Sequence, residues 1–289
     1  MYSNTPDSAI YFFSKAQNIA QKMEDELKEC DAVRRLGIAF SAKGDENKPL
    51  ILFEEALRLA VKHLASKNKS EGMKAKNLKS IIYENIGAHY ISMDDFNTAL
   101  HNHLISAELS AEIGNKKNLL HLMLKIGNDY FFIDNFPKAI EYYFKGLKLA
   151  EEAGDKQKLA DCYGRIGTVF SNQGYLSKAL EYYLPALKLS EEIDSKYNIL
   201  SNLGNIGIVY TELKNYDKAL SYYSRALSIS KEIGNKFGES MSLGNLGIVY
   251  KEKGDYYRAI EFYNQAIIIS EAEGNKKGLC SHYANRENH

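Results

Sequence analysis

The sequence has little or nothing of several features that would restrict its structure or function. It has no tryptophan. It also has only four prolines in 289 residues, and because proline breaks helices, long helices can run without interruption. The 37 basic residues balance the 37 acidic ones, which argues against bulk attraction to nucleic acid or to an anionic membrane. The sequence also has no apolar run of about 18 residues, which is the length that spans a bilayer. We therefore expect no nucleic-acid partner and no membrane insertion.

Cysteine is scarce as well. Cys30, Cys162 and Cys280 lie far apart in the sequence and form no Cys-x-x-Cys pair. An odd, scattered set is typical of reduced thiols inside a cell and not of a disulfide framework. The first residues lack a basic region followed by an apolar stretch, as a signal peptide would have. We predict a cytoplasmic protein, with a periplasmic sensor region as the alternative if a leader was removed.

An internal repeat with a period of 40 residues dominates the sequence. Glycine recurs with this period, each time followed three residues later by an aromatic residue, at Gly87, Gly127, Gly167, Gly207 and Gly247. Alanine recurs with the same period at Ala99, Ala139, Ala179, Ala219 and Ala259. A fixed period of this size indicates a solenoid or an array of stacked units.

The spacing of apolar residues within one unit predicts two helices. In the last full unit, a stripe with the spacing i, i+3, i+4, i+7 comprises Leu243, Leu246, Gly247 and Tyr250. A second stripe, with the spacing i, i+4, i+7, comprises Ala259, Tyr263 and Ala266. The small residues would let the two helices approach closely, and the tyrosines would fill the space beside them. Such a hairpin has two apolar faces and must stack on its neighbours.

The units resemble the tetratricopeptide repeat (TPR). The matching elements are Leu-Gly-x-x-Tyr, seen in NLGIVY, and Ala-x3-Tyr-x2-Ala, seen in ALSYYSRA. The family's period is about 34 residues, and the longer version here resembles the repeats of kinesin light chains, Pins-type polarity adaptors, bacterial Rap-type regulators and bacterial sensor proteins. The resemblance implies an all-α fold, a right-handed α-solenoid (superhelix) of antiparallel helix hairpins.

We expect a single array over residues 1–289, with about six full repeats and an unpaired helix at each end. The predicted parts are the second helix of an incomplete repeat at 6–29, repeat 1 at 30–66, an insertion or longer junction at 67–79, repeats 2 to 6 at 80–119, 120–159, 160–199, 200–239 and 240–274, and an incomplete or capping helix at 275–289. The open ends of such an array could let copies of the chain associate.

Motifs of common enzymes are missing from the sequence. It contains no Walker-type phosphate loop, no His-Glu-x-x-His, no nucleophile elbow and no Gly-x-Gly-x-x-Gly after a strand. The two closely spaced histidines, His101 and His103, would point to different sides of a helix, so they do not predict a metal site. We predict a non-catalytic protein with no cofactor and no metal. An enzyme with an unrecognised site stays open as an alternative.

In the TPR family the first helix of each hairpin lines the inner groove, and residues beside the Leu-Gly element contact peptides. The matching candidates here are Asn85, Lys125, Asn128, Arg165, Asn205 and Asn245. An asparagine amide both donates and accepts hydrogen bonds, so a row of them can pair with the backbone of an extended peptide. Lys125 and Arg165 would hold a carboxylate or phosphate, Arg165 through two parallel hydrogen bonds.

The resemblance thus implies a protein-interaction module that binds a peptide or helix of a partner protein in the concave groove. Two other interpretations stay open. The candidate side chains could be merely solvated, or could cap neighbouring helices. The chain could also be the sensory or regulatory input region of a bacterial signalling protein whose effector domain is missing from this chain.

Overall fold

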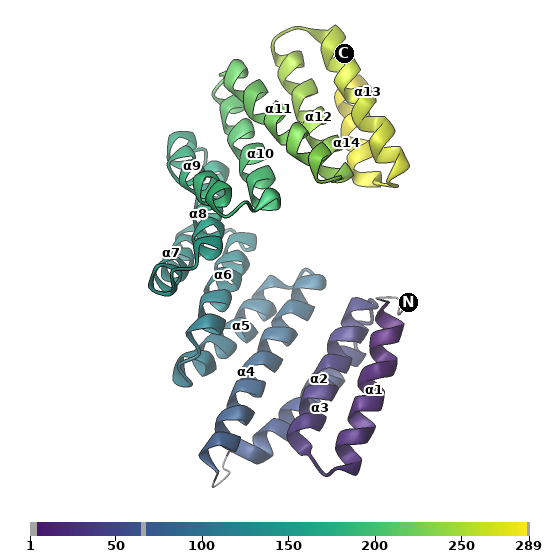
Figure 1. Cartoon of the computed structure of the whole chain (residues 1–289), viewed down its shortest axis with the longest axis vertical. Coiled ribbons are helices and arrows are strands. Elements are labelled where there is room, and N and C mark those ends of the chain that lie inside the picture. The colour runs from purple at the N-terminus through teal and green to yellow at the C-terminus, as the bar shows by residue number, and fades with distance from the viewer. Residues whose placement is uncertain (1–4, 65–67, 288–289) are drawn as a thin grey trace. The chain divides into compact units, whose positions relative to one another are not determined.

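The computed structural model describes residues 5–64 and 68–287, which form fourteen α-helices (Figure 1). The helices are α1 (Pro6–Lys22), α2 (Glu26–Ala42), α3 (Lys48–Leu64), α4 (Lys69–Ser92), α5 (Phe96–Glu112), α6 (Lys116–Phe132), α7 (Phe136–Ala153), α8 (Lys156–Asn172), α9 (Leu176–Glu192), α10 (Lys196–Glu212), α11 (Tyr216–Glu232), α12 (Lys236–Glu252), α13 (Tyr256–Ala272) and α14 (Lys276–Glu287). The described residues contain no strand, and the predicted all-α class is confirmed.

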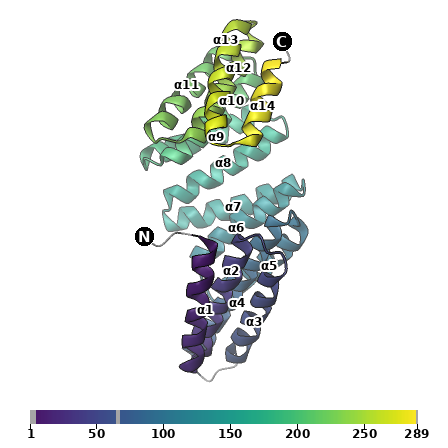
Figure 2. The same cartoon turned by 90° about the vertical axis from the view of Figure 1, so that its right-hand side faces the viewer.

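The chain divides into two compact units, unit 1 (Met1–Leu149) and unit 2 (Ala150–His289). Within each unit, helices that follow one another in the chain pack side by side (Figures 1 and 2). Six hairpins, from α2–α3 to α12–α13, carry the repeat, while α1 and α14 each lack a hairpin partner among the described residues. This arrangement confirms the expected solenoid of about six units with a single helix at each end.

The helices begin and end at residues suited to those places. Asp155 Oδ1 accepts a hydrogen bond from the backbone N–H of Lys158 at 3.0 Å, and Asn235 Oδ1 accepts one from Gly238 at 2.9 Å. Such caps satisfy backbone amides that the first helical turn leaves unpaired. After the second helix of a hairpin the backbone turns left-handed, with φ of 65° at Gly154 and 67° at Gly234, a conformation that glycine adopts without strain.

Each hairpin closes where a ring of the second helix packs on a glycine of the first. A Cβ atom added to these glycines would lie only 2.4 to 2.8 Å from a ring atom. The pairs are Gly37–Phe53, Gly87–His103, Gly127–Tyr143, Gly167–Tyr183, Gly207–Tyr223 and Gly247–Tyr263. The expected close approach of the two helices at glycine is therefore confirmed, and it explains why this residue recurs with the repeat.

The first helix of the second hairpin is longer than the others. Helix α4 has 24 residues, whereas α2, α6, α8, α10 and α12 have 17 each. Residues 69–79 of the predicted insertion are thus helical, and residues 65–67 lie outside the described residues. The later first helices begin at Lys116, Lys156, Lys196 and Lys236, four residues before the predicted repeat starts.

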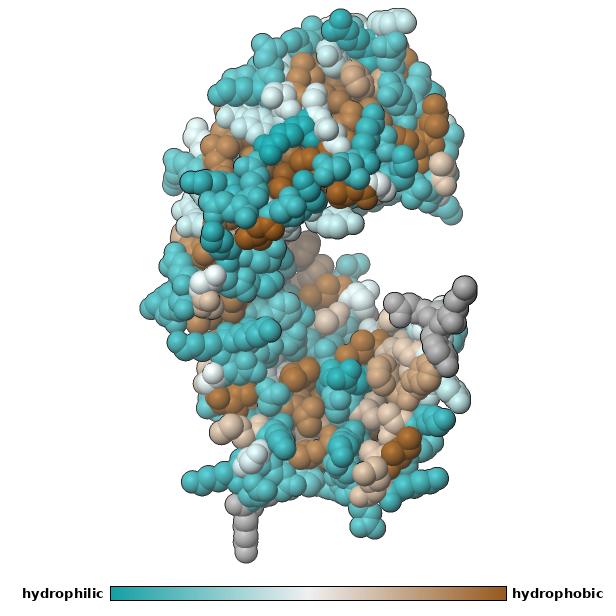
Figure 3. Space-filling model, viewed as in Figure 1, coloured by the Kyte–Doolittle hydropathy of each residue, from teal (hydrophilic) through white to brown (hydrophobic). Residues whose placement is uncertain are grey.

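Polar side chains cover much of the surface seen in Figure 3, and apolar atoms lie between them along several helices. Among the described residues, none of the helices combines the length and the apolar content needed to cross a bilayer. The apolar side chains pack mainly between successive helices, as in the cluster that Val209, Tyr183 and Leu203 share in unit 2.

Candidate peptide-binding site

All six candidate residues lie on first helices of hairpins, and all six are half-buried. In unit 1, Asn85 lies on α4, and Lys125 and Asn128 lie on α6. In unit 2, Arg165 lies on α8, Asn205 on α10 and Asn245 on α12. The asparagines of the two sets differ in whether their amide groups are already bonded within the chain.

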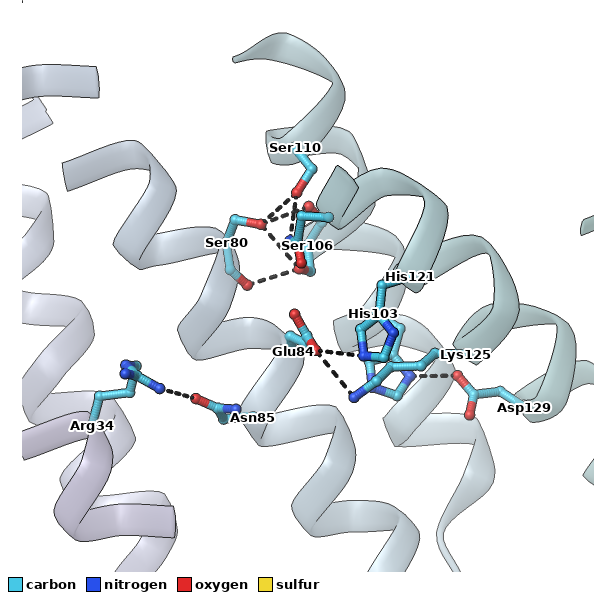
Figure 4. A network of polar contacts seen from close by, with 11 residues as sticks. Arg34, Ser80, Glu84, Asn85, His103, Ser106, Ser110, His121, Lys125 and Asp129 are labelled. Atoms are coloured by element: carbon cyan, nitrogen blue, oxygen red, sulfur yellow. Dashed lines mark hydrogen bonds and ion pairs between the residues drawn. The ribbon is translucent and has the colours of Figure 1, made fainter. Parts of the chain in front are cut away.

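The two asparagines of unit 1 are tied into the fold. Arg34 Nη1 donates a hydrogen bond to Asn85 Oδ1 at 3.0 Å (Figure 4). The hydroxyl of Tyr143 donates one to Asn128 Oδ1 at 2.8 Å. Each amide oxygen therefore already accepts a hydrogen bond inside the protein. A peptide backbone would have to share or displace these bonds.

Lys125 is also engaged within unit 1. Its Nζ lies 3.1 Å from Glu84 Oε1, and His121 Nε2 lies 3.4 Å from the same oxygen (Figure 4). Burial raises the pKa of Glu84, but the hydrogen bond from His121 and the charge of Lys125 outweigh it and lower this pKa to about 2. Glu84 is thus ionised at neutral pH and supplies the anion that we expected Lys125 to take from a partner.

Unit 2 has a polar cavity of about 280 Å³ beside Arg165 and Asn205. Helices α8 and α10 form it, and its wall includes Asp161, Thr168 and Asn202. Charged and amide groups line most of this cavity, so it suits a polar group such as a carboxylate, a hydroxyl or a peptide bond.

A second cavity of about 350 Å³ lies beside the first, between α10 and α12, and both Asn205 and Asn245 line it. Among the described residues, neither asparagine side chain has a hydrogen-bond partner. Tyr197 and Phe237, which are 69% and 61% exposed, form the apolar rim. The cavity is therefore an open apolar groove with two free amides.

Gly204 keeps one side of this groove open. A Cβ atom at that position would meet nothing within 4 Å. Its counterpart Gly244 is different, because a Cβ there would lie 2.5 Å from the His282 ring of α14. Of these two glycines, one leaves room in the groove wall and the other serves packing between helices.

The aromatic rim was not predicted from the sequence. Tyr197 and Phe237 are 40 residues apart, directly after the lysine that starts each first helix. The corresponding positions of earlier units hold Lys117 and Gln157, which are polar. The repeat alignment thus contained the signal: two successive units place an aromatic residue where the earlier two have a polar one.

A serine and a histidine in unit 2 lie as close as a nucleophile and its base would. Ser240 Oγ is 3.0 Å from His282 Nε2, and it also lies 2.7 Å from Ser270 Oγ. All three side chains are buried, so a substrate could not reach the serine hydroxyl. The contact holds α14 against α12. In the part of the chain that the structure describes, no group of three or more His, Cys, Asp or Glu residues is placed to hold a metal ion.

Comparison with known proteins identifies the family. Models of the tetratricopeptide repeat match residues 160–193 and 198–272. The chain is a tetratricopeptide repeat protein. A comparison with curated proteins finds no match.

Solved structures share the fold of this TPR chain at low identity. BtubC (BKLC) from P. vanneervenii is 20% identical, with 94% of each chain covered and a TM-score of 0.51. A Rap protein in complex with the Competence and Sporulation Factor is 17% identical, with 95% of this chain and 76% of that chain covered and a TM-score of 0.65. A STAND protein with a tetratricopeptide repeat sensor from Pyrococcus horikoshii is 19% identical, with 95% of this chain but 44% of that chain covered and a TM-score of 0.73. At these identities the likeness establishes the fold alone.

Proposed function

We propose that this TPR chain is a non-catalytic protein-interaction module that binds an extended peptide segment of a partner along α10 and α12. One observation carries the proposal: Asn205 and Asn245 line a single open cavity, and their amides make no hydrogen bond among the described residues. Half-buried amides without partners can gain hydrogen bonds when a peptide backbone arrives.

The surroundings of the two amides suit a peptide that has an apolar side chain. Tyr197 and Phe237 present exposed aromatic area at the rim of the groove, where burial on binding is favourable. Arg165 lies in the polar cavity that shares Asn205 with this groove. A carboxylate next to the apolar side chain of the peptide would meet the guanidinium group there.

The three candidate residues of unit 1 should contribute less to peptide binding than those of unit 2. Asn85, Lys125 and Asn128 already bond to Arg34, Glu84 and Tyr143. A partner would have to replace these intramolecular contacts, so the net gain per contact is smaller than at free amides. TPR proteins in general bind proteins or peptides, and the complex of the Rap protein with its factor gives a case of ligand binding on this fold.

Peptides selected on the full chain from a random displayed library would test the proposal. We expect selected peptides to bind with micromolar affinity and to lose about fivefold or more with Asn205→Ala or Asn245→Ala, which corresponds to about 1 kcal/mol each. Asn97→Ala, at an exposed asparagine of α5 in unit 1, is the matched control and should leave binding unchanged. Binding that is unaffected by both groove variants would overturn the proposal.

A second candidate is a sensory input region. The similar P. horikoshii protein has a TPR sensor within a larger chain, 44% of which aligns with this one. The same peptide-binding groove would then receive a signal instead of a stable partner. An open reading frame that continues past His289 into a kinase, cyclase or DNA-binding region would favour this candidate over an adaptor.

A further inference from the structure

Helix α1 leaves uncovered an apolar face that its counterpart α3 buries. Residues of α1 correspond to residues 40 positions later in α3. Leu52 and Leu59 of α3 are 8% and 9% exposed, whereas the corresponding Phe12 and Ile19 of α1 are 48% and 50% exposed. The apolar side chains at these two positions are thus buried on α3 and about half exposed on α1.

The covering element in the first hairpin is α2. Its Cys30, Val33 and Leu36 pack in one apolar cluster with Phe53 and Leu59 of α3. On α1, no helix covers the corresponding face within residues 5–64 and 68–287. Two cavities of about 480 and 740 Å³ lie there instead, the first between α1 and α2 and the second between α1, α2 and residues 74–78 of α4.

The two cavities form one groove, because both are lined by Phe13 of α1 and Arg35 of α2. We call it the α1–α2 groove, and its apolar wall comprises Phe12, Phe13, Ala16, Ile19 and Ile38. Apolar colouring follows α1 along this part of unit 1 in Figure 3. The groove occupies the place that the first helix of a hairpin takes beside its second helix.

We propose that the α1–α2 groove binds one amphipathic α-helix of a partner protein, which lies on α1 as α2 lies on α3. The bound helix completes the hairpin that α1 begins. This surface is separate from the groove of Asn205 and Asn245 in unit 2, and the proposal does not depend on peptide binding there.

The ring of Phe13 defines the first requirement for the bound helix. In the first hairpin, the counterpart ring of Phe53 packs so closely on α2 that a Cβ atom at Gly37 would lie 2.6 Å from it. Phe13 corresponds to Phe53, and the five other hairpins all have glycine at this contact. The bound helix therefore has glycine opposite Phe13.

Charge at the end of α1 defines the second requirement. Glu26 at the start of α2 pairs with Lys62 near the end of α3 at 2.9 Å. In unit 2 the charges are exchanged, since Lys156 starts α8 and pairs at 2.8 Å with Glu192 at the end of α9. Lys22 of α1 corresponds to Lys62 and is exposed, with no acidic partner among the described residues. An acidic residue at the start of the bound helix complements it.

Both requirements disfavour α14 of a second copy as the occupant. The position of α14 that matches Gly37 holds Glu287, whose side chain would collide with the Phe13 ring. The position that matches Glu26 holds Lys276, which would face Lys22 and repel it. The occupant is thus a helix of another protein, with an acidic first turn and a Leu-Gly pair about ten residues later, as at Leu36 and Gly37 of α2.

A synthetic peptide of residues 25–43, which carries the sequence of α2, is the probe. We expect this peptide to bind the full chain in a fluorescence anisotropy titration. Phe12→Asp or Ile19→Asp in the chain should weaken the affinity for the peptide by about tenfold or more. Ile51→Asp changes an apolar residue on α3 that is 62% exposed, and it serves as the control. The peptide with Gly37→Leu should bind poorly to every form of the chain.

Charge exchange makes the test specific for the orientation of the helix. The peptide with Glu26→Lys should bind the natural chain less well and should recover with the Lys22→Glu chain. No binding up to about 1 mM, or binding that Ile19→Asp leaves unchanged, would overturn the proposal. A concentration-dependent dimer in sedimentation that Ile19→Asp abolishes would overturn it too, because a second copy would then be the occupant.

Discussion

His103 Nδ1 lies 2.6 Å from Asp129 Oδ2 in the interior of unit 1, where neither side chain is exposed to solvent (Figure 4). The pair joins α5 to α6. Eighty residues later, the corresponding positions hold Tyr183 and Val209, which are both buried and belong to one apolar cluster. Unit 1 has therefore exchanged an aromatic and an aliphatic residue together for a buried polar pair.

Removal of one member of this pair should destabilise the protein more than removal of both. His103→Phe leaves the Asp129 carboxylate buried without its partner, which should lower the free energy of unfolding by about 3–5 kcal/mol. His103→Phe combined with Asp129→Val should recover most of this loss, because Phe53 already occupies the corresponding position in the first hairpin. Urea unfolding of the single and double variants measures the coupling.

Unit 2 provides a reference for this double-mutant cycle, because Tyr183, which corresponds to His103, lies in an apolar cluster. Tyr183→Phe removes only a hydroxyl that donates to Thr168 Oγ1 at 3.1 Å, and we expect a loss of about 1 kcal/mol. If the losses of His103→Phe and Asp129→Val simply add in the double variant, the two groups do not stabilise each other and the interpretation is wrong.

The ion pair of Glu84 with Lys125 should make stability depend on acid pH. The pKa of Glu84 is lowered from 4.5 to about 2, so the native state favours the ionised form. Its contribution is complete above pH 4.5 and is lost as the pH falls toward 2, on the order of 3 kcal/mol in all. Glu84→Gln should flatten the pH dependence of the urea midpoint in this range. An unchanged slope in this variant would contradict the assignment.

The fold was predictable because the repeat constrains it at many positions at once. Glycine and alanine at a period of 40 allow helices to meet, and the six Gly–ring contacts show the packing that this spacing requires. The contacts that a long side chain makes with distant residues do not recur with this period. Arg34 reaches Asn85 across 51 residues, and nothing in the pattern around either residue indicates that contact.

The candidate site was predictable in its position on first helices but not in its surroundings. Asn205 and Asn245 follow from their place beside the Leu-Gly element. Whether an amide at this place is free depends on residues of other helices, such as Tyr143, which bonds Asn128. His103 and Asp129 both depart from the repeat, which has Tyr and Val at the corresponding positions of unit 2. The two residues lie in different helices, so only the structure shows that they are in contact.

The three cysteines should differ sharply in reactivity. Burial raises the pKa of the Cys30 and Cys162 thiols to about 12, whereas Cys280 is exposed on α14. Because the thiolate is the reactive form, a native sample at pH 8 should titrate about one thiol rapidly with a disulfide reagent and the other two only in denaturant. Cys280→Ser should abolish the rapid phase. Fast labelling that persists in this variant would mean that a buried thiol becomes accessible.

Two glycines three residues apart on α10 should respond in opposite directions to the same substitution. A Cβ atom at Gly207 would lie 2.4 Å from Tyr223 Cε1, and the buried Tyr223 ring cannot move away. Gly207→Ala should therefore lower the free energy of unfolding by about 1–3 kcal/mol.

Gly204 presents the contrasting case, since an added Cβ meets nothing within 4 Å. Alanine is the better helix former, so Gly204→Ala should raise the free energy of unfolding by about 0.5–1 kcal/mol. Urea unfolding of the two variants, followed by circular dichroism, measures both effects on one helix. Equal losses at both positions would show that glycine is needed along α10 for a reason other than the close approach of Tyr223, because only one of the two sites is crowded.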